Sequence, residues 1–153
     1  EMCIRDRNNR PKYMKLDVFF NGEKMSLTSK KYANHFYILK YKVNEVKQLN
    51  EKNQCTLIDI RDIRELWRDG TIKGALHIPR GMLEFWLDPN SQYYNKDKFS
   101  KDKKLILFCA AGMRSALATK TLKDMGYNNI AHAEGGFGSL ANHGLEIITK
   151  EKK

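Results

Sequence analysis

The residues best suited to chemistry are Cys109 and the short segment that follows it. The chain reads as an apolar run over 105–108, then Cys109, a turn of small residues and Arg114, followed by a helical pattern through Met125. This order places Cys109 between the carboxyl end of a predicted strand and the amino end of a predicted helix. Unpaired backbone N–H groups and the helix dipole stabilise negative charge there, and the pKa of a cysteine falls in such surroundings. We therefore predict that Cys109 is a nucleophilic thiolate; the competing interpretation is a buried cysteine that packs as a small apolar side chain.

Length and composition describe one ordinary domain. The chain has 153 residues, of which 41% are hydrophobic and 30% charged, a composition typical of a soluble globular protein. No apolar run approaches the length of a membrane span, and the first residues lack the apolar core of a secretory signal, so we expect a cytoplasmic protein that does not bind a membrane. The three cysteines have no paired spacing and no neighbouring histidine cluster, so neither a disulfide scaffold nor a metal site is expected.

The formal net charge of +10 raises the question of an anionic partner. The lysines are scattered, and the densest group, between Lys96 and Lys104, alternates with aspartates in a polar stretch. Because no aromatic stacking motif accompanies these lysines, we favour a solvated surface over nucleic-acid binding. A positive field would still draw small anions toward a cleft.

The sequence divides into four parts. Residues 1–7 contain Met-Cys-Ile-Arg-Asp-Arg, which the transposon-end adapter used in sequencing-library preparation encodes in one reading frame, so we predict that they are translated adapter. Residues 8–40 are a predicted N-terminal extension with a possible hairpin over 16–27, indicated by an Asn-Gly turn between two apolar runs. The regular domain is predicted over 41–148, and 149–153 form a charged tail.

Short strands alternate with short helices through the regular domain. Strands are expected over 55–60, 75–79, 105–108 and 129–133, with helical segments over 43–53, 61–69, 80–87, 113–125 and 137–145. Cys55, in the first of these strands, is expected in the core. Such alternation predicts an α/β fold with a parallel sheet covered on both faces.

Five motifs, in order, resemble those of a single-domain rhodanese, a sulfurtransferase. They are Leu57-Ile58-Asp59-Ile60-Arg61, Gly70-Thr71-Ile72-Lys73-Gly74-Ala75, Ile78-Pro79-Arg80-Gly81, Cys109-Ala110-Ala111-Gly112-Met113-Arg114-Ser115 and Glu134-Gly135-Gly136-Phe137. The resemblance implies a five-stranded parallel sheet with helices on both faces, Cys109 as the sulfur-carrying residue, and the backbone of Ala110, Ala111, Gly112, Met113, Arg114 and Ser115 as its cradle. Thr71, Lys73 and Leu140 depart from residues that the family often has, but they lie outside the cysteine loop.

The spacing within the cysteine loop favours sulfur over phosphate. Four residues separate Cys109 from Arg114, whereas phosphatases that resemble this fold have five between cysteine and arginine. The shorter ring is better suited to a single sulfur atom, and Gly112 lets the backbone curl tightly enough for several N–H groups to converge on it. Arg114 could either add positive charge beside the thiolate or tie the loop to a carboxylate; the sequence leaves both roles open.

The predicted reaction is a double displacement in which Cys109 takes a sulfane sulfur from thiosulfate or a persulfide and passes it to a thiol or cyanide. The expected partners are a small anionic sulfur donor and a thiol acceptor, either a small molecule or a protein such as a thioredoxin-like reductant, with no metal or organic cofactor. The alternatives are a cysteine phosphatase or arsenate reductase on the same fold, and a non-catalytic persulfide-binding module.

Other polar and aromatic residues carry weaker signals. In the family that the chain resembles, Asp59 and Arg61 sit at the end of a strand next to the site, where they would either line the pocket or brace loops by ion pairing. Glu84, Phe85 and Trp86 could form a pocket wall, although an aromatic pair beside leucines more often belongs to a core.

Overall fold

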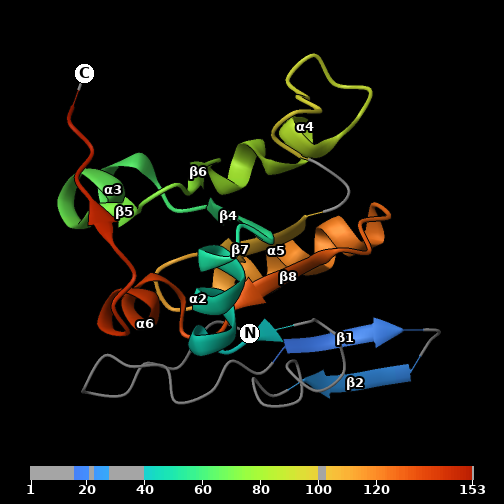
Figure 1. Ribbon diagram of the computed structural model, residues 1–153. Helices are drawn as coiled ribbons and strands as arrows, with labels where there is room; N and C mark the ends of the chain where they lie inside the picture. The colour runs from blue at the N-terminus through green and yellow to red at the C-terminus, as the bar shows by residue number, and fades with distance from the viewer. Residues whose placement is uncertain (1–15, 21–22, 28–39, 100–102, 153) are drawn as a thin grey trace, which may run out of the picture. The chain divides into compact units, whose positions relative to one another are not determined.

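The computed structural model describes residues 16–20, 23–27, 40–99 and 103–152 (Figure 1). The chain divides into two units, Glu1–Tyr37 and Ile38–Lys153. In the first unit, β1 (Leu16–Phe20) and β2 (Glu23–Leu27) pair antiparallel and are the two strands of the predicted hairpin. The Asn-Gly turn of that hairpin, the predicted adapter segment and the rest of the extension up to residue 39 lie outside the described residues.

The second unit is built on a five-stranded sheet in the order β3-β8-β7-β4-β6, and every neighbouring pair in it is parallel. The strands are β3 (Lys40–Tyr41), β4 (Cys55–Asp59), β6 (Leu76–His77), β7 (Lys104–Phe108) and β8 (Ile130–Ala133). The α/β fold predicted from the sequence is confirmed. Strand β7 lies in the middle of the sheet, so the segment that leaves its carboxyl end is flanked by the ends of β4 and β8.

Helices cover both faces of this sheet (Figure 1). On one face, α2 (Val43–Glu51) and α6 (Gly136–Asn142) share a core with the strands; on the other, α4 (Leu83–Leu87) and α5 (Met113–Asp124) do so. Alternate residues of β7 supply the two cores, since Ile106 and Phe108 face α2 and α6, whereas Leu105 and Leu107 face α4 and α5. Cys109 continues the second set, so its side chain is directed to the α4 and α5 face.

Short helices and a second, two-stranded sheet lie between the main elements. Helix α3 (Ile63–Asp69) follows β4, and the short helix η1 (Arg80–Met82) precedes α4. Strands β5 (Thr71–Ile72) and β9 (Ile147–Ile148) pair antiparallel in a small sheet of their own, which the sequence did not predict. Strand β6 lies within the predicted strand 75–79, but β3, β5 and β9 were not predicted, because two residues outside a longer apolar run carry too little periodicity to be recognised.

A buried ion pair stands where β4 ends. Asp59 and Arg61 both have an exposed fraction of 0%, and the Arg61 guanidinium donates to Asp59 through Nε at 3.0 Å and through Nη2 at 2.7 Å. The hydroxyl of Thr71 also donates to the Asp59 carboxylate, at 2.7 Å, and Arg61 Nη2 donates to the carbonyl of Gly70 at 2.7 Å. The Arg61 guanidinium lies 3.8 Å from the ring centre of Phe137, a residue of α6. These contacts join β4, the end of α3, β5 and α6 at one point.

Removing the arginine of this pair should destabilise the fold. In Arg61→Leu the Asp59 carboxylate is left buried without its cation, so we expect the free energy of unfolding to fall by about 3–5 kcal/mol in urea titrations. The matched control is Arg64→Leu, because Arg64 pairs with Asp62 at the surface, with 80% of its side chain exposed. That change should cost less than about 1 kcal/mol. Equal effects of the two substitutions would contradict the central role given to the buried pair.

Candidate active site

The cysteine loop leaves the carboxyl end of β7 and leads directly into α5. Cys109 follows the last residue of β7, and Gly112, at φ 95°, is the residue before the first turn of α5. The positive φ is one that glycine adopts easily, and it turns the backbone back toward the cysteine. Only 1% of Cys109 is exposed, so its sulfur lies beneath the loop.

Hydrogen-bond donors converge on the Cys109 sulfur from the loop and the first turn of α5. The N–H of Gly112 donates to Sγ at 3.2 Å, and the Ser115 hydroxyl oxygen lies 3.6 Å from it. The same hydroxyl lies 3.0 Å from the carbonyl oxygen of Gly112, so its single proton can be given to either acceptor. The arrangement is an anion-binding nest closed by a helix amino terminus.

These donors decide the ionisation of Cys109. Burial is the largest single influence and by itself raises the pKa of the thiol, because it disfavours the charged form. The hydrogen bonds from the Ser115 N–H, the Ser115 hydroxyl, and the N–H groups of Gly112 and Ala111 together outweigh burial, so the pKa of Cys109 is lowered from its ordinary value of 9.0. The structure thus stabilises a thiolate inside the loop.

The Glu134-Gly135-Gly136 segment forms the back wall of the loop. The N–H of Phe137 donates to the carbonyl of Cys109 at 2.7 Å, and the N–H of Gly138 donates to the carbonyl of Ala110 at 3.3 Å. A Cβ on Gly136 would lie 2.3 Å from the Cys109 carbonyl oxygen, and Gly136 has a φ of 60°. Only glycine therefore lets the start of α6 approach the loop this closely.

Arg114 is held by a carboxylate that the sequence analysis did not single out. Its Nη1 and Nη2 donate to the two carboxylate oxygens of Glu65 at 2.7 and 2.8 Å, which ties the loop to α3. The hydrogen bonds to Arg114 are the main reason that the pKa of Glu65 is lowered. Glu65 also accepts from the N–H of Asp62 at 3.2 Å as part of a capping box. That box was visible in the sequence, but nothing in it indicated a partner 49 residues away.

The other predicted site residues fall into two groups. Ala110, Ala111 and Met113 lie on the outer surface of the loop, and Met113 is 73% exposed. Asp59 and Arg61 pair with each other beneath the neighbouring strand end, which is the bracing arrangement of the two that the sequence left open. Of the aromatic residues on α4, Phe85 is 56% exposed and Trp86 packs against the α5 side of the core.

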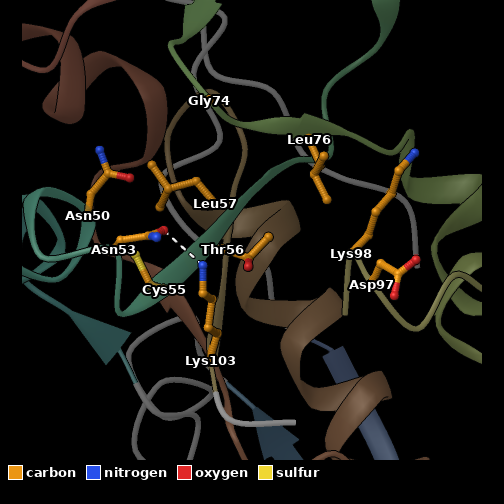
Figure 2. Close-up of a pocket in the computed structure, with 10 residues that line it drawn as sticks. All are labelled: Asn50, Asn53, Cys55, Thr56, Leu57, Gly74, Leu76, Asp97, Lys98 and Lys103. Carbon is orange, nitrogen blue, oxygen red and sulfur yellow. Dashed lines mark hydrogen bonds between the residues drawn. The ribbon is translucent and has the colours of Figure 1, made fainter. Parts of the chain in front are cut away.

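Cys55 has a different environment, at the opposite end of the parallel strands. It lines a cavity of about 290 Å³ together with polar residues such as Asn53 and Lys103, whose side chains are hydrogen bonded to each other at 2.8 Å (Figure 2). Burial raises the pKa of Cys55 to about 11, with Lys103 opposing the shift. Cys55 therefore stays a protonated thiol at neutral pH, and the cavity is separate from the cysteine loop.

Within residues 16–20, 23–27, 40–99 and 103–152, no group of three or more histidine, cysteine or acidic side chains is placed to hold a metal ion, and no helix is long and apolar enough to cross a membrane.

Comparison with known proteins decides the family. The sequence model of the rhodanese-like domain family matches residues 42–143 of this chain. The chain belongs to the rhodanese-like domain family.

Relatives of this rhodanese-like domain include sulfurtransferases. Over 97 residues it is 33% identical to the mouse thiosulfate sulfurtransferase/rhodanese-like domain-containing protein 3, covering 61% of this chain and 62% of that one. It is 28% identical over 115 residues to a sulfurtransferase of Allochromatium vinosum, covering 71% of this chain and 98% of that one. A tRNA uridine(34) hydroxylase of Bdellovibrio bacteriovorus is 36% identical over 90 residues, 59% of this chain but 24% of its own length.

A solved structure shows the same fold at higher identity. It is a Rhodopseudomonas palustris protein of unknown function, described as a possible tyrosine phosphatase, with 43% identity and a TM-score of 0.69 over 77% of this chain and 89% of that one.

The glycine wall should not tolerate a side chain. Gly136→Ala places a Cβ against the Cys109 carbonyl, so we expect the free energy of unfolding to fall by more than about 2 kcal/mol. Gly81→Ala is the control, because no heavy atom lies within 4 Å of its Cβ position, and its effect should stay within about 0.5 kcal/mol. Urea titration of both variants measures the difference. A Gly136→Ala protein as stable as the control would show that the wall is not needed.

The hydroxyl of Ser115 should lower the pKa of Cys109. In Ser115→Ala one donor to the thiolate is lost, so the pKa of Cys109 rises and a smaller fraction of Cys109 is thiolate at any given pH. The measurement is the pH dependence of alkylation at Cys109, followed on its own peptide by mass spectrometry, with Ser91→Ala as the control. The alkylation midpoint should move to higher pH only in Ser115→Ala. An unchanged midpoint would show that the backbone N–H groups alone stabilise the Cys109 thiolate.

Proposed function

We propose that this rhodanese-like domain is a sulfurtransferase that carries a sulfane sulfur as a persulfide on Cys109. The observation that carries the proposal is the convergence of the Gly112 N–H and the Ser115 hydroxyl on a cysteine sulfur that is 1% exposed. A persulfide carries its negative charge on one atom, its terminal sulfur. Donors that converge on one point favour a charge concentrated on one atom.

Two displacements complete the reaction. The Cys109 thiolate attacks the outer sulfur of a donor, a sulfur–sulfur bond forms to Cys109, and the donor's own bond to that sulfur breaks, its electron pair leaving with sulfite or a thiolate. A thiolate or cyanide then attacks the outer sulfur, and the electron pair of the Cys109 persulfide bond returns to Cys109. No external oxidant is consumed. The lowered pKa of Cys109 supports both steps, because it raises the fraction of Cys109 that is thiolate before the first and makes Cys109 a better leaving group in the second.

The relatives named as sulfurtransferases support this reaction, and the most complete of these alignments covers 98% of the relative's length. The competing reaction is phosphate ester hydrolysis, because the structurally similar protein of Rhodopseudomonas palustris is described as a possible tyrosine phosphatase. A phosphate carries several oxygens and is best bound by a guanidinium free to form two parallel hydrogen bonds. Here both terminal nitrogens of Arg114 already donate to Glu65, which favours sulfur over phosphate.

Parallel turnover assays separate the two reactions. We expect thiocyanate to form from a sulfane donor and cyanide, no hydrolysis of a generic phosphate ester, and loss of transfer in Cys109→Ser. Cys55→Ser is the matched control and should keep its activity, since that thiol lies in the separate cavity. Phosphate ester hydrolysis that disappears in Cys109→Ser, without any sulfur transfer, would instead assign the site to a phosphatase.

A further inference from the structure

We call the exposed residues of the cysteine loop and the start of α5, namely Ala110, Ala111, Met113, Arg114 and Leu117, the mouth of the loop. The charge at this mouth is unusual for a site expected to receive an anion. Among the loop residues from Ala110 to Ser115, Arg114 is the one charged side chain. Both of its terminal nitrogens are bound to Glu65, in a pair whose side chains are 45% and 20% exposed. The two charges form a neutral unit, so the cation adds little net attraction at the point where a donor enters.

Arg114 interacts with Cys109, but its interaction with Glu65 is the stronger of the two. The pKa of Arg114 is raised above its ordinary value first by its hydrogen bonds to Glu65, with smaller contributions from the Cys109 thiolate. Because its guanidinium is hydrogen bonded to Glu65, the main role of Arg114 is to hold the loop in place, and binding a substrate is secondary. Its contribution to anion binding is therefore set by Glu65.

The rest of the mouth is apolar. Met113 is 73% exposed and Leu117 is 55% exposed, and their spacing of four residues places both on one face of α5, next to the loop. Ala110 and Ala111 are exposed as well. These side chains can pack against carbon but cannot replace the water around a second negative charge.

We propose that Glu65 sets the donor specificity of this site: by neutralising Arg114 it disfavours small sulfur dianions such as thiosulfate, and with Met113 and Leu117 it favours organic persulfides and thiosulfonates. The inference rests on the proposed sulfur transfer and chooses among its donors. An organic donor brings one charge, on the sulfur that the backbone N–H groups receive, and an organic group that packs on the apolar mouth. The net charge of +10 attracts thiosulfate, a dianion, more strongly than a monoanionic donor, and salt weakens this long-range attraction for both.

Three donors that differ in charge and size test the proposal through the first displacement alone. They are thiosulfate, methanethiosulfonate and benzenethiosulfonate; in each the Cys109 thiolate takes the outer sulfur, and the old sulfur–sulfur bond leaves its electron pair on sulfite or a sulfinate. The second-order rate constant for persulfide formation on Cys109 is read by quenching and mass spectrometry. We expect the order benzenethiosulfonate, then methanethiosulfonate, then thiosulfate.

Glu65→Gln should release the arginine for dianion binding. We expect the ratio of the thiosulfate to the benzenethiosulfonate rate constant to rise about fivefold at low salt and less at high salt. Because each ratio is taken within one protein, a lower folded fraction cancels. Glu146→Gln is the matched control: it removes the same charge from an exposed pair with Lys73 and should leave the ratio unchanged. In an Arg114→Met background, Glu65→Gln should no longer raise the ratio.

Leu117→Ser tests the apolar half of the mouth. We expect it to slow benzenethiosulfonate about threefold relative to methanethiosulfonate, because the aromatic group loses a packing surface.

The outcomes distinguish this inference from the function on which it rests. Loading by all three donors with thiosulfate fastest, or a ratio unmoved by Glu65→Gln, would overturn the donor specificity and leave the sulfurtransferase intact. A ratio that rises equally in Glu146→Gln, or that still rises without Arg114, would also overturn it, since the effect would not pass through Arg114. Failure of every donor to load Cys109 would overturn both proposals.

Discussion

The rest of the site depends on how a negative sulfur can be kept inside the fold. Cys109 is 1% exposed, and a buried anion is strongly disfavoured unless hydrogen-bond donors replace the water that it loses. The Gly112 N–H and the Ser115 hydroxyl supply that replacement. Their value depends on fixed position, because donors that had to reorganise around the charge would stabilise it less.

Two contacts from different elements fix the loop. Glu65, on α3, holds Arg114, and the start of α6 donates to the carbonyls of Cys109 and Ala110. The buried Arg61 links these two supports, since it donates to the carbonyl that follows α3 and lies over the Phe137 ring of α6. A side chain that touches neither the sulfur nor the loop thus contributes to the geometry around Cys109.

Local patterns in the sequence predicted four of the five strands of the sheet and the position of Cys109, whereas the number five came from the family resemblance and β3 was not predicted. The apolar runs that became β4, β7 and β8 are long enough to show, and the small residues after Cys109 mark a strand-to-helix turn. Contacts between distant segments were beyond this reasoning. The pairing of Glu65 with Arg114 spans 49 residues, and the two-residue strands β5 and β9 exist only because the fold brings them together. The same limit applies to Arg61, whose charge gave no sign that it would be fully buried.

The measurement that tests the central claim most directly is the mass of the intact protein after incubation with a sulfane sulfur donor and removal of the excess. The account predicts that the wild-type chain gains one sulfur atom, that a thiol reductant removes it, and that Cys109→Ser gains none. A wild-type chain that gains no sulfur from any donor, while Cys109 remains free to react with an alkylating agent, would contradict the account.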